Sequence, residues 1–83
     1  MTHIWGPVTW TRAVFLRAHK DLSTDPPQLV VELAAGRRLM NSDWTGFDVT
    51  EEKVLHLTLG SHIEYATWSS FDPQKWFCDV RCV

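Results

Sequence analysis

The spacing of apolar positions predicts a first helix near the N-terminus. Within residues 8–22, apolar side chains recur at every fourth position and basic side chains fall on other faces, which favours an amphipathic helix. Pro7 suits the first turn of such a helix. The same segment also permits a strand, because one parity holds a second apolar set: Val8, Trp10, Val14, Leu16 and Ala18.

A second helix is predicted to run from Pro26 to about Met40. Asp25 can cap its start, with Pro26 as the first helical residue and Gln28 completing a capping box. Apolar residues between 29 and 39 cover almost every face, which is typical of a buried helix. The alternative is a buried strand over residues 29–35 that turns at Gly36.

Residues 54–69 carry the pattern of a β-hairpin. Leucines alternate over 55–59, and Ile63, Tyr65 and Thr67 alternate in the second half. Placing both sets on one face requires a three-residue loop at 60–62. The final segment, 73–82, fits either a short helix or a third strand.

Together these elements predict a single α+β domain over residues 1–83. Two helices would pack on an antiparallel hairpin or a three-stranded sheet. The alternative is an all-β small barrel with residues 8–18 and 29–35 as strands. A domain of this size buries only about 60–65% of its unfolded surface. The 45% hydrophobic content and five tryptophans provide for an efficient core.

Charge and targeting signals narrow the function classes. The net charge of −2 disfavours a protein that coats nucleic acid, since phosphate binding rests on clustered Lys and Arg. Residues 1–40 hold five basic and three acidic side chains, whereas residues 41–83 hold three and seven. The chain shows no signal-peptide pattern and no apolar run long enough for a membrane span. We therefore expect a cytoplasmic protein with reduced thiols.

An acidic-aromatic stretch over residues 43–52 is the strongest candidate for a binding site. It contains four carboxylates and two large aromatic side chains without a basic residue. An exposed Trp is a frequent binding anchor, and carboxylates around it attract basic surfaces. The alternative is that Trp44 and Phe47 cover the core. With Trp68 taken as exposed, the predicted partner-binding residues are Asp43, Trp44, Phe47, Asp48, Glu51, Glu52 and Trp68.

The sequence thus predicts a non-catalytic protein-binding module without a cofactor. It could act as an inhibitor on a basic, nucleic-acid-binding partner, because accessory inhibitors of phages and mobile elements are often of this size, an association rather than a derivation. We expect no enzyme activity, since no phosphate loop or nucleophile motif is present. A homo-oligomer remains open. Two alternatives are a weak nucleic-acid-binding domain and a zinc domain using His56, His62, Cys78 and Cys82.

Overall fold

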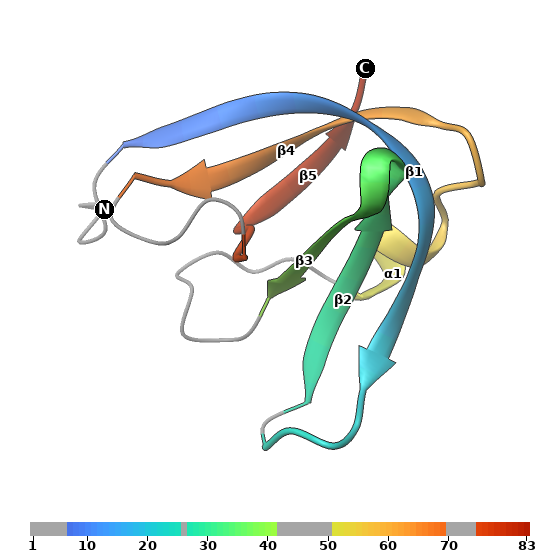
Figure 1. The fold of residues 1–83 in the computed structure, drawn as a ribbon, viewed down its shortest axis with the longest axis vertical. Helices are drawn as coiled ribbons and strands as arrows, with labels where there is room; N and C mark the ends of the chain where they lie inside the picture. Colours follow the sequence, from blue (N-terminus) through green and yellow to red (C-terminus); the bar gives the residue numbers. More distant parts are fainter. Residues whose placement is uncertain (1–6, 26, 42–50, 70–74) are drawn as a thin grey trace.

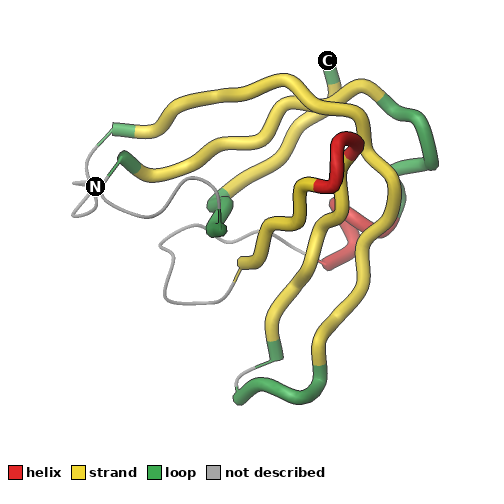
Figure 2. The backbone as a smooth tube through the Cα atoms, viewed as in Figure 1, coloured by secondary structure: helices red, strands yellow, loops and turns green. Residues whose placement is uncertain are grey.

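The computed structural model describes residues 7–25, 27–41, 51–69 and 75–83, without the side chains of Glu51 and Glu52. Five strands dominate this part of the chain (Figures 1 and 2). In chain order the elements are β1 (Val8–Asp21), β2 (Gln28–Leu33), the 3-10 turn η1 (Ala34–Gly36), β3 (Arg37–Asn41), α1 (Glu51–Leu55), β4 (His62–Trp68) and β5 (Asp79–Cys82).

Strand β1 is the central strand of the sheet, whose strand order is β3-β2-β1-β4-β5. Its first half, residues 8–14, pairs antiparallel with β4, and its second half, residues 15–21, pairs antiparallel with β2. The register with β2 shifts between Phe15 and Arg17, which is a β-bulge. A bulge increases local twist and bends a strand. Strand β1 therefore curves from the β4–β5 side of the molecule to the β2–β3 side (Figure 1).

The two ends of this sheet come back together. The amide of Met40 on β3 donates to the carbonyl of Lys75 at 2.9 Å, and the amide of Phe77 donates to the carbonyl of Met40 at 3.0 Å. These bonds form a parallel bridge between Met40 and Trp76, just before β5 begins. The sheet is therefore rolled into a small, partly closed barrel.

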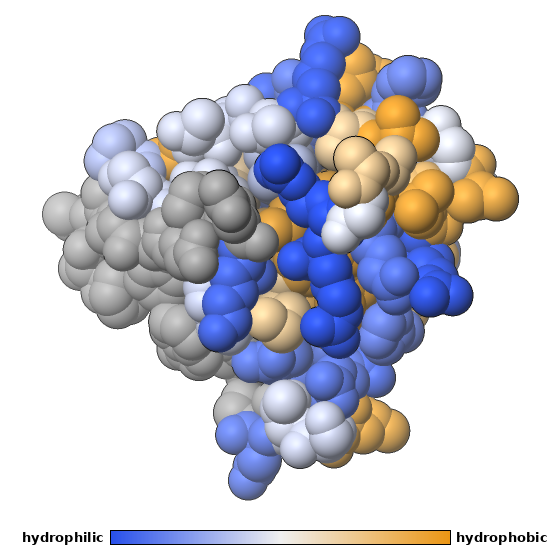
Figure 3. Space-filling view, viewed as in Figure 1, coloured by the Kyte–Doolittle hydropathy of each residue, from blue (hydrophilic) through white to orange (hydrophobic). Residues whose placement is uncertain are grey.

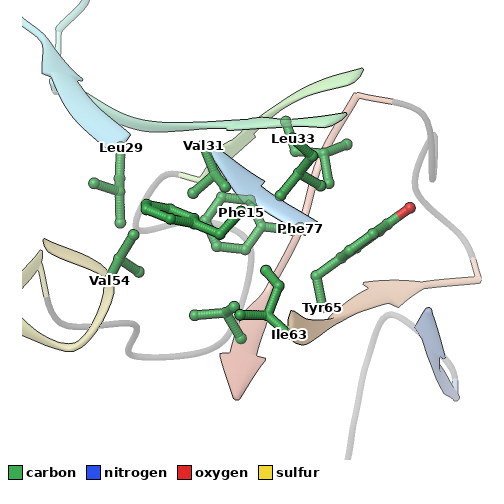
Figure 4. Close-up of a cluster of buried hydrophobic side chains, with 10 residues drawn as sticks. Phe15, Leu29, Val31, Leu33, Val54, Ile63, Tyr65 and Phe77 are labelled. Atoms are coloured by element: carbon green, nitrogen blue, oxygen red, sulfur yellow. The ribbon is translucent and has the colours of Figure 1, made fainter. Parts of the chain in front are cut away.

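The inward side chains of all five strands form one core (Figure 4). Tyr65 and Ile63 come from β4, while Phe15 comes from the bulge of β1. Burying a large apolar side chain contributes roughly 1.5–3 kcal/mol, so this cluster is the main source of stability. Its buried members are Phe15, Leu29, Val31, Leu33, Leu39, Val54, Ile63, Tyr65, Phe77 and Val80.

The predicted α+β fold with two packed helices is wrong. Residues 8–21 form one strand, and residues 28–41 form two strands joined by a tight turn. The bulge breaks the strict alternation of β1, so helical spacing fitted the sequence as well as strand spacing did. In β2 the run Leu29-Val30-Val31 is apolar because both faces of the strand are covered. The alternative all-β barrel placed strands at residues 8–18 and 29–35, which correspond to β1 and β2. Its second strand was too long, because residues 34–36 form the turn η1.

The predicted hairpin over residues 54–69 is half correct. Strand β4 is present and points Ile63 and Tyr65 to the core, but its partners are β1 and β5. The leucine-rich half begins with α1, and Leu57 has no regular structure. Leu59 is 76% exposed. Of the two alternatives for the C-terminal segment, the strand is correct, as β5.

Candidate binding face

The side chains that point away from the core on residues 15–21 of β1, on β2 and on β3 form a surface that we call the outer face. Residues directly opposite each other on neighbouring strands point to the same side of a sheet. Register places His19 beside Val30 and Val30 beside Met40, and it places Arg17 beside Glu32 and Glu32 beside Arg38. The outer face therefore consists of Arg17, His19, Asp21, Gln28, Val30, Glu32, Arg38 and Met40, with Trp76 next to Met40.

An apolar strip crosses the middle of the outer face. It begins at Val30, which is fully buried, and continues through Met40 to Trp76, which are both half-buried. The parallel bridge between Met40 and Trp76 fixes the last step of this strip. The ammonium group of Lys75 lies 5.6 Å from the centre of the Trp76 ring, within cation–π range.

Cationic side chains and two carboxylates share the described outer face. Arg17 donates two hydrogen bonds to Glu32, at 3.0 and 3.1 Å, and Nδ1 of His19 lies 3.7 Å from a Glu32 oxygen. The bonds from Arg17 hold the pKa of Glu32 below its usual value, with smaller contributions from His19 and Arg38. The same interaction raises the pKa of Arg17. Asp21 is the second carboxylate of this face, and it interacts electrostatically with Arg38 and His19.

A capped turn connects β1 to β2 at one end of the outer face. The Asp21 carboxylate accepts hydrogen bonds from the amide of Ser23 at 3.0 Å and from its hydroxyl at 2.6 Å. These two bonds lower the pKa of Asp21. The turn that the sequence predicted as a helix start at Asp25 is thus closed by the side chain of Asp21.

All eight Lys and Arg of the chain lie on described residues. In Figure 3, strongly hydrophilic side chains gather over the middle of the view, where β2 and β3 lie in Figure 1.

Most of the predicted partner-binding residues fall outside the described part of the chain. Asp43, Trp44, Phe47 and Asp48 belong to residues 42–50, which join β3 to α1. Glu51 and Glu52 begin α1, but their side chains are not described. The fold does place both ends of this connection: Asn41 donates to the carbonyl of Phe77 at 2.8 Å, and Val54 is fully buried.

The prediction of an exposed Trp68 is wrong, since its side chain is only 2% exposed. Trp68 points away from the main core, but that side of the sheet carries a second cluster. Its members are Ala66, Trp68 and Cys78, with Val8 and Trp10 packed against them.

The four zinc-ligand candidates do not converge. His56, His62 and Cys82 are exposed, whereas Cys78 is fully buried, and no group of three potential ligands occurs among the described residues. Burial, with a smaller effect from Asp79, raises the pKa of Cys78 to about 12. Its thiol is therefore protonated at neutral pH, which makes it a poor ligand and a poor nucleophile.

Sequence reasoning missed the apolar strip because the strip depends on pairing. Val30 and Met40 are ten residues apart and meet only through the β2–β3 turn, while Trp76 reaches Met40 through the closure of the barrel. The strand alternative with a turn at Gly36 named no partner strand for residues 29–35, so it did not predict the first of these contacts. No local pattern pointed to the second.

The chain matches no protein-family model, no curated protein and no solved structure. Within the described residues, neither helical segment has the length and apolar character needed to cross a bilayer.

Proposed function

We propose that the protein is a small non-catalytic binding module that holds single-stranded nucleic acid across its outer face. The observation that carries this proposal is the pair of half-buried side chains Met40 and Trp76 on the outer face, with Arg38 and Lys75 next to them in the chain and on the same side of the molecule. Proteins that bind single strands combine aromatic surfaces for the bases with positive charge along the backbone, and this face has both.

Each part of the outer face has a role in this proposal. The ring of Trp76 stacks on a base, a contact that is sequence-tolerant because every base has a π-face. Arg38, which has no ion pair among the described residues, and Lys75 bind flanking phosphates. Arg17 contributes less, because its two hydrogen bonds to Glu32 occupy part of its guanidinium.

The barrel itself supports the proposal by analogy. Five strands, a bent β1 shared by both halves, a helix between β3 and β4, and a β3 that runs parallel to the segment before β5 are similar to an oligonucleotide-binding (OB) barrel. Such barrels bind single strands on the face of strands 2 and 3. Fold alone does not establish function, so the argument rests on the side chains of the outer face.

The test is binding of a fluorescently labelled twelve-nucleotide oligothymidine, followed by anisotropy at several salt concentrations. We expect Trp76→Leu to weaken binding by roughly 5- to 100-fold, the value of one base stack. Arg38→Gln should lower the salt slope by about one unit. Trp10→Leu is the matched control, because Trp10 is also half-buried but lies on the half of β1 that pairs with β4, away from the outer face. Equal losses for the two tryptophan variants, or no binding at low salt, would reject the proposal.

A second candidate is the predicted protein-binding function of the acidic-aromatic stretch. Asp43, Asp48, Trp44 and Phe47 belong to the connection between β3 and α1, and Glu51 and Glu52 begin α1; this composition supports docking of a basic protein surface. In this proposal the protein is cytoplasmic and inhibits a nucleic-acid-binding partner. Trp44→Ala should abolish capture of that partner from host lysate while the variant keeps its near-ultraviolet circular dichroism. Unfolding of Trp44→Ala would instead show that the side chain supports the core.

A further inference from the structure

A pocket at one end of the barrel lies apart from the outer face. It has a volume of about 280 Å³ and is bordered by the bend of β1 and by the β2–β3 turn. Its apolar wall comes from Ala13, Val14, Leu33 and Ala34, and its polar groups come from Thr11, Arg37 and Tyr65. This volume suits a small molecule or a single ring, just below the usual range of ligand pockets.

Arg37 supplies the positive charge of this pocket. Its guanidinium donates a hydrogen bond to the hydroxyl of Tyr65, which reaches it from the opposite side of the barrel. Tyr65 is only 3% exposed, and Figure 4 shows its hydroxyl at the margin of the core cluster. No carboxylate of the described residues lies within ion-pair distance of Arg37. A guanidinium held by a buried tyrosine, with donors left over, is suited to a phosphate or carboxylate.

The adjoining turn has an unusual backbone. Ala35 adopts a φ of 70° and a ψ of 22°, and Gly36 follows at a φ of 75°. Left-handed geometry costs an alanine roughly 1 kcal/mol. Two consecutive residues with positive φ are typical of the tight turn of a β-hairpin. This turn borders the pocket through Ala34 and Ala35.

The other arginine that borders the pocket, Arg12, is already paired with an acid. Glu64 accepts a hydrogen bond from Arg81 at 2.8 Å and lies 3.7 Å from Nε of Arg12, a residue that also lines the pocket. Glu64 therefore neutralises those two arginines on the outside of the sheet and leaves Arg37 as the free charge of the pocket.

We propose that this end of the barrel binds a small ligand with an anionic head on an apolar body, with Arg37 holding the head and Ala13, Val14 and Leu33 covering the body. This site is separate from the proposed nucleic-acid face, because Arg37 and Arg38 are neighbours in a strand and point to opposite sides.

The experiment titrates the isotope-labelled full chain with phenyl phosphate, benzoate and phenol, followed by nuclear magnetic resonance. The two anions test phosphate and carboxylate heads, and phenol is the uncharged control. We expect saturable shifts at the amides of Ala34 and Ala35 and at Nε of Arg37 with at least one anion and not with phenol.

Two substitutions decide whether Arg37 is responsible. Arg37→Gln should weaken binding of the anion about tenfold or more, in line with a charged hydrogen bond. Arg38→Gln should leave it within about twofold. Tyr65→Phe, which removes only the hydroxyl that positions Arg37, should weaken binding less than Arg37→Gln. The absence of saturable shifts with both anions, or equal binding by Arg37→Gln and wild type, would overturn the proposal.

The nucleic-acid proposal has a distinguishable outcome. Arg37→Gln should keep the oligothymidine affinity of the wild type, and phenyl phosphate should not displace the oligonucleotide. Loss of both ligands in Arg37→Gln would contradict the separation of the two sites.

Discussion

The two halves of β1 present very different surfaces on the side away from the core. Beside β4, the outward positions at the start of β1 are apolar and sealed: Trp68 is 2% exposed and Ala66 is fully buried. Toward the bend, Arg12 and Arg81 pair with Glu64, and the Arg12 side chain is 76% exposed. Arg81 lies 3.7 Å above the Trp10 ring and covers it. Beside β2, the outward positions alternate between the apolar strip and an ion-pair cluster, with Arg17 73% exposed.

The two halves of β1 therefore differ in role: the half beside β4 adds to stability, and the half beside β2 is available for binding. A small barrel has a limited core, so covering a second apolar cluster outside the sheet adds buried area. The β4 half uses its outer side in this way. The β2 half leaves a tryptophan, a methionine and several cations accessible, at a cost in stability that a ligand can offset when it binds.

The largest expected effect tests whether the β4 half is truly structural. Trp68→Ala should lower the free energy of unfolding by about 3–5 kcal/mol, measured by urea denaturation, because it empties a closed cluster. Trp76→Ala, on the half-buried strip, should cost clearly less. Equal costs for the two variants would remove the distinction between the two surfaces.

The next effect concerns Cys78, which lies in the same sealed cluster. Its pKa is about 12, above the value near 9 of an unfolded thiol, so the native state holds this proton more tightly. The protonated thiol of Cys78 therefore makes its full contribution to the free energy of unfolding below pH 9, and this contribution declines as the pH rises toward 12. We expect unfolding free energy to fall about 2 kcal/mol more between pH 9 and 11 in wild type than in Cys78→Ala. Cys82→Ala, at an exposed thiol, is the control and should behave as wild type.

The smallest effect sharpens the description of the β2 half. Glu32→Gln removes the carboxylate that Arg17 and His19 share, so the outer face gains positive charge. Oligothymidine binding should strengthen roughly two- to fivefold, and it should depend more steeply on salt. Weaker binding in Glu32→Gln would mean that the carboxylate orients Arg17 for the ligand and does not compete with it.

The sequence predicted part of the fold where one face of a strand is buried. The alternation of Ile63 and Tyr65 defined β4 correctly, since each residue faces the core. Residues 8–22 were wrongly predicted as a helix. The bulge at Phe15 shifts the alternation of inward and outward side chains in the middle of the strand, so the apolar residues have a spacing close to that of a helix. Residues 29–33 were also wrongly predicted as a helix, because a strand covered on both faces shows no alternation of apolar and polar residues.

The candidate binding face was harder to predict than the fold. Arg37 and Arg38 are adjacent in the sequence, but only register shows that they lie on opposite sides of the sheet. Tertiary packing buries Trp68 almost completely and leaves Trp76 half-buried. Such distinctions arise from contacts between residues far apart in the chain, which a single sequence does not encode locally.

The shared strand β1 also determines the order in which the chain can fold. Strands β1, β2 and β3 are consecutive, so their pairings close short loops, whereas Val8 must find Trp68 across sixty residues. Contacts between distant residues form more slowly than local ones. During synthesis, the β1–β2–β3 meander can form while the N-terminal half of β1 still lacks its partner. Trp10 then stays uncovered until the last quarter of the protein has left the ribosome, which makes this half of β1 the most aggregation-prone segment of the nascent chain.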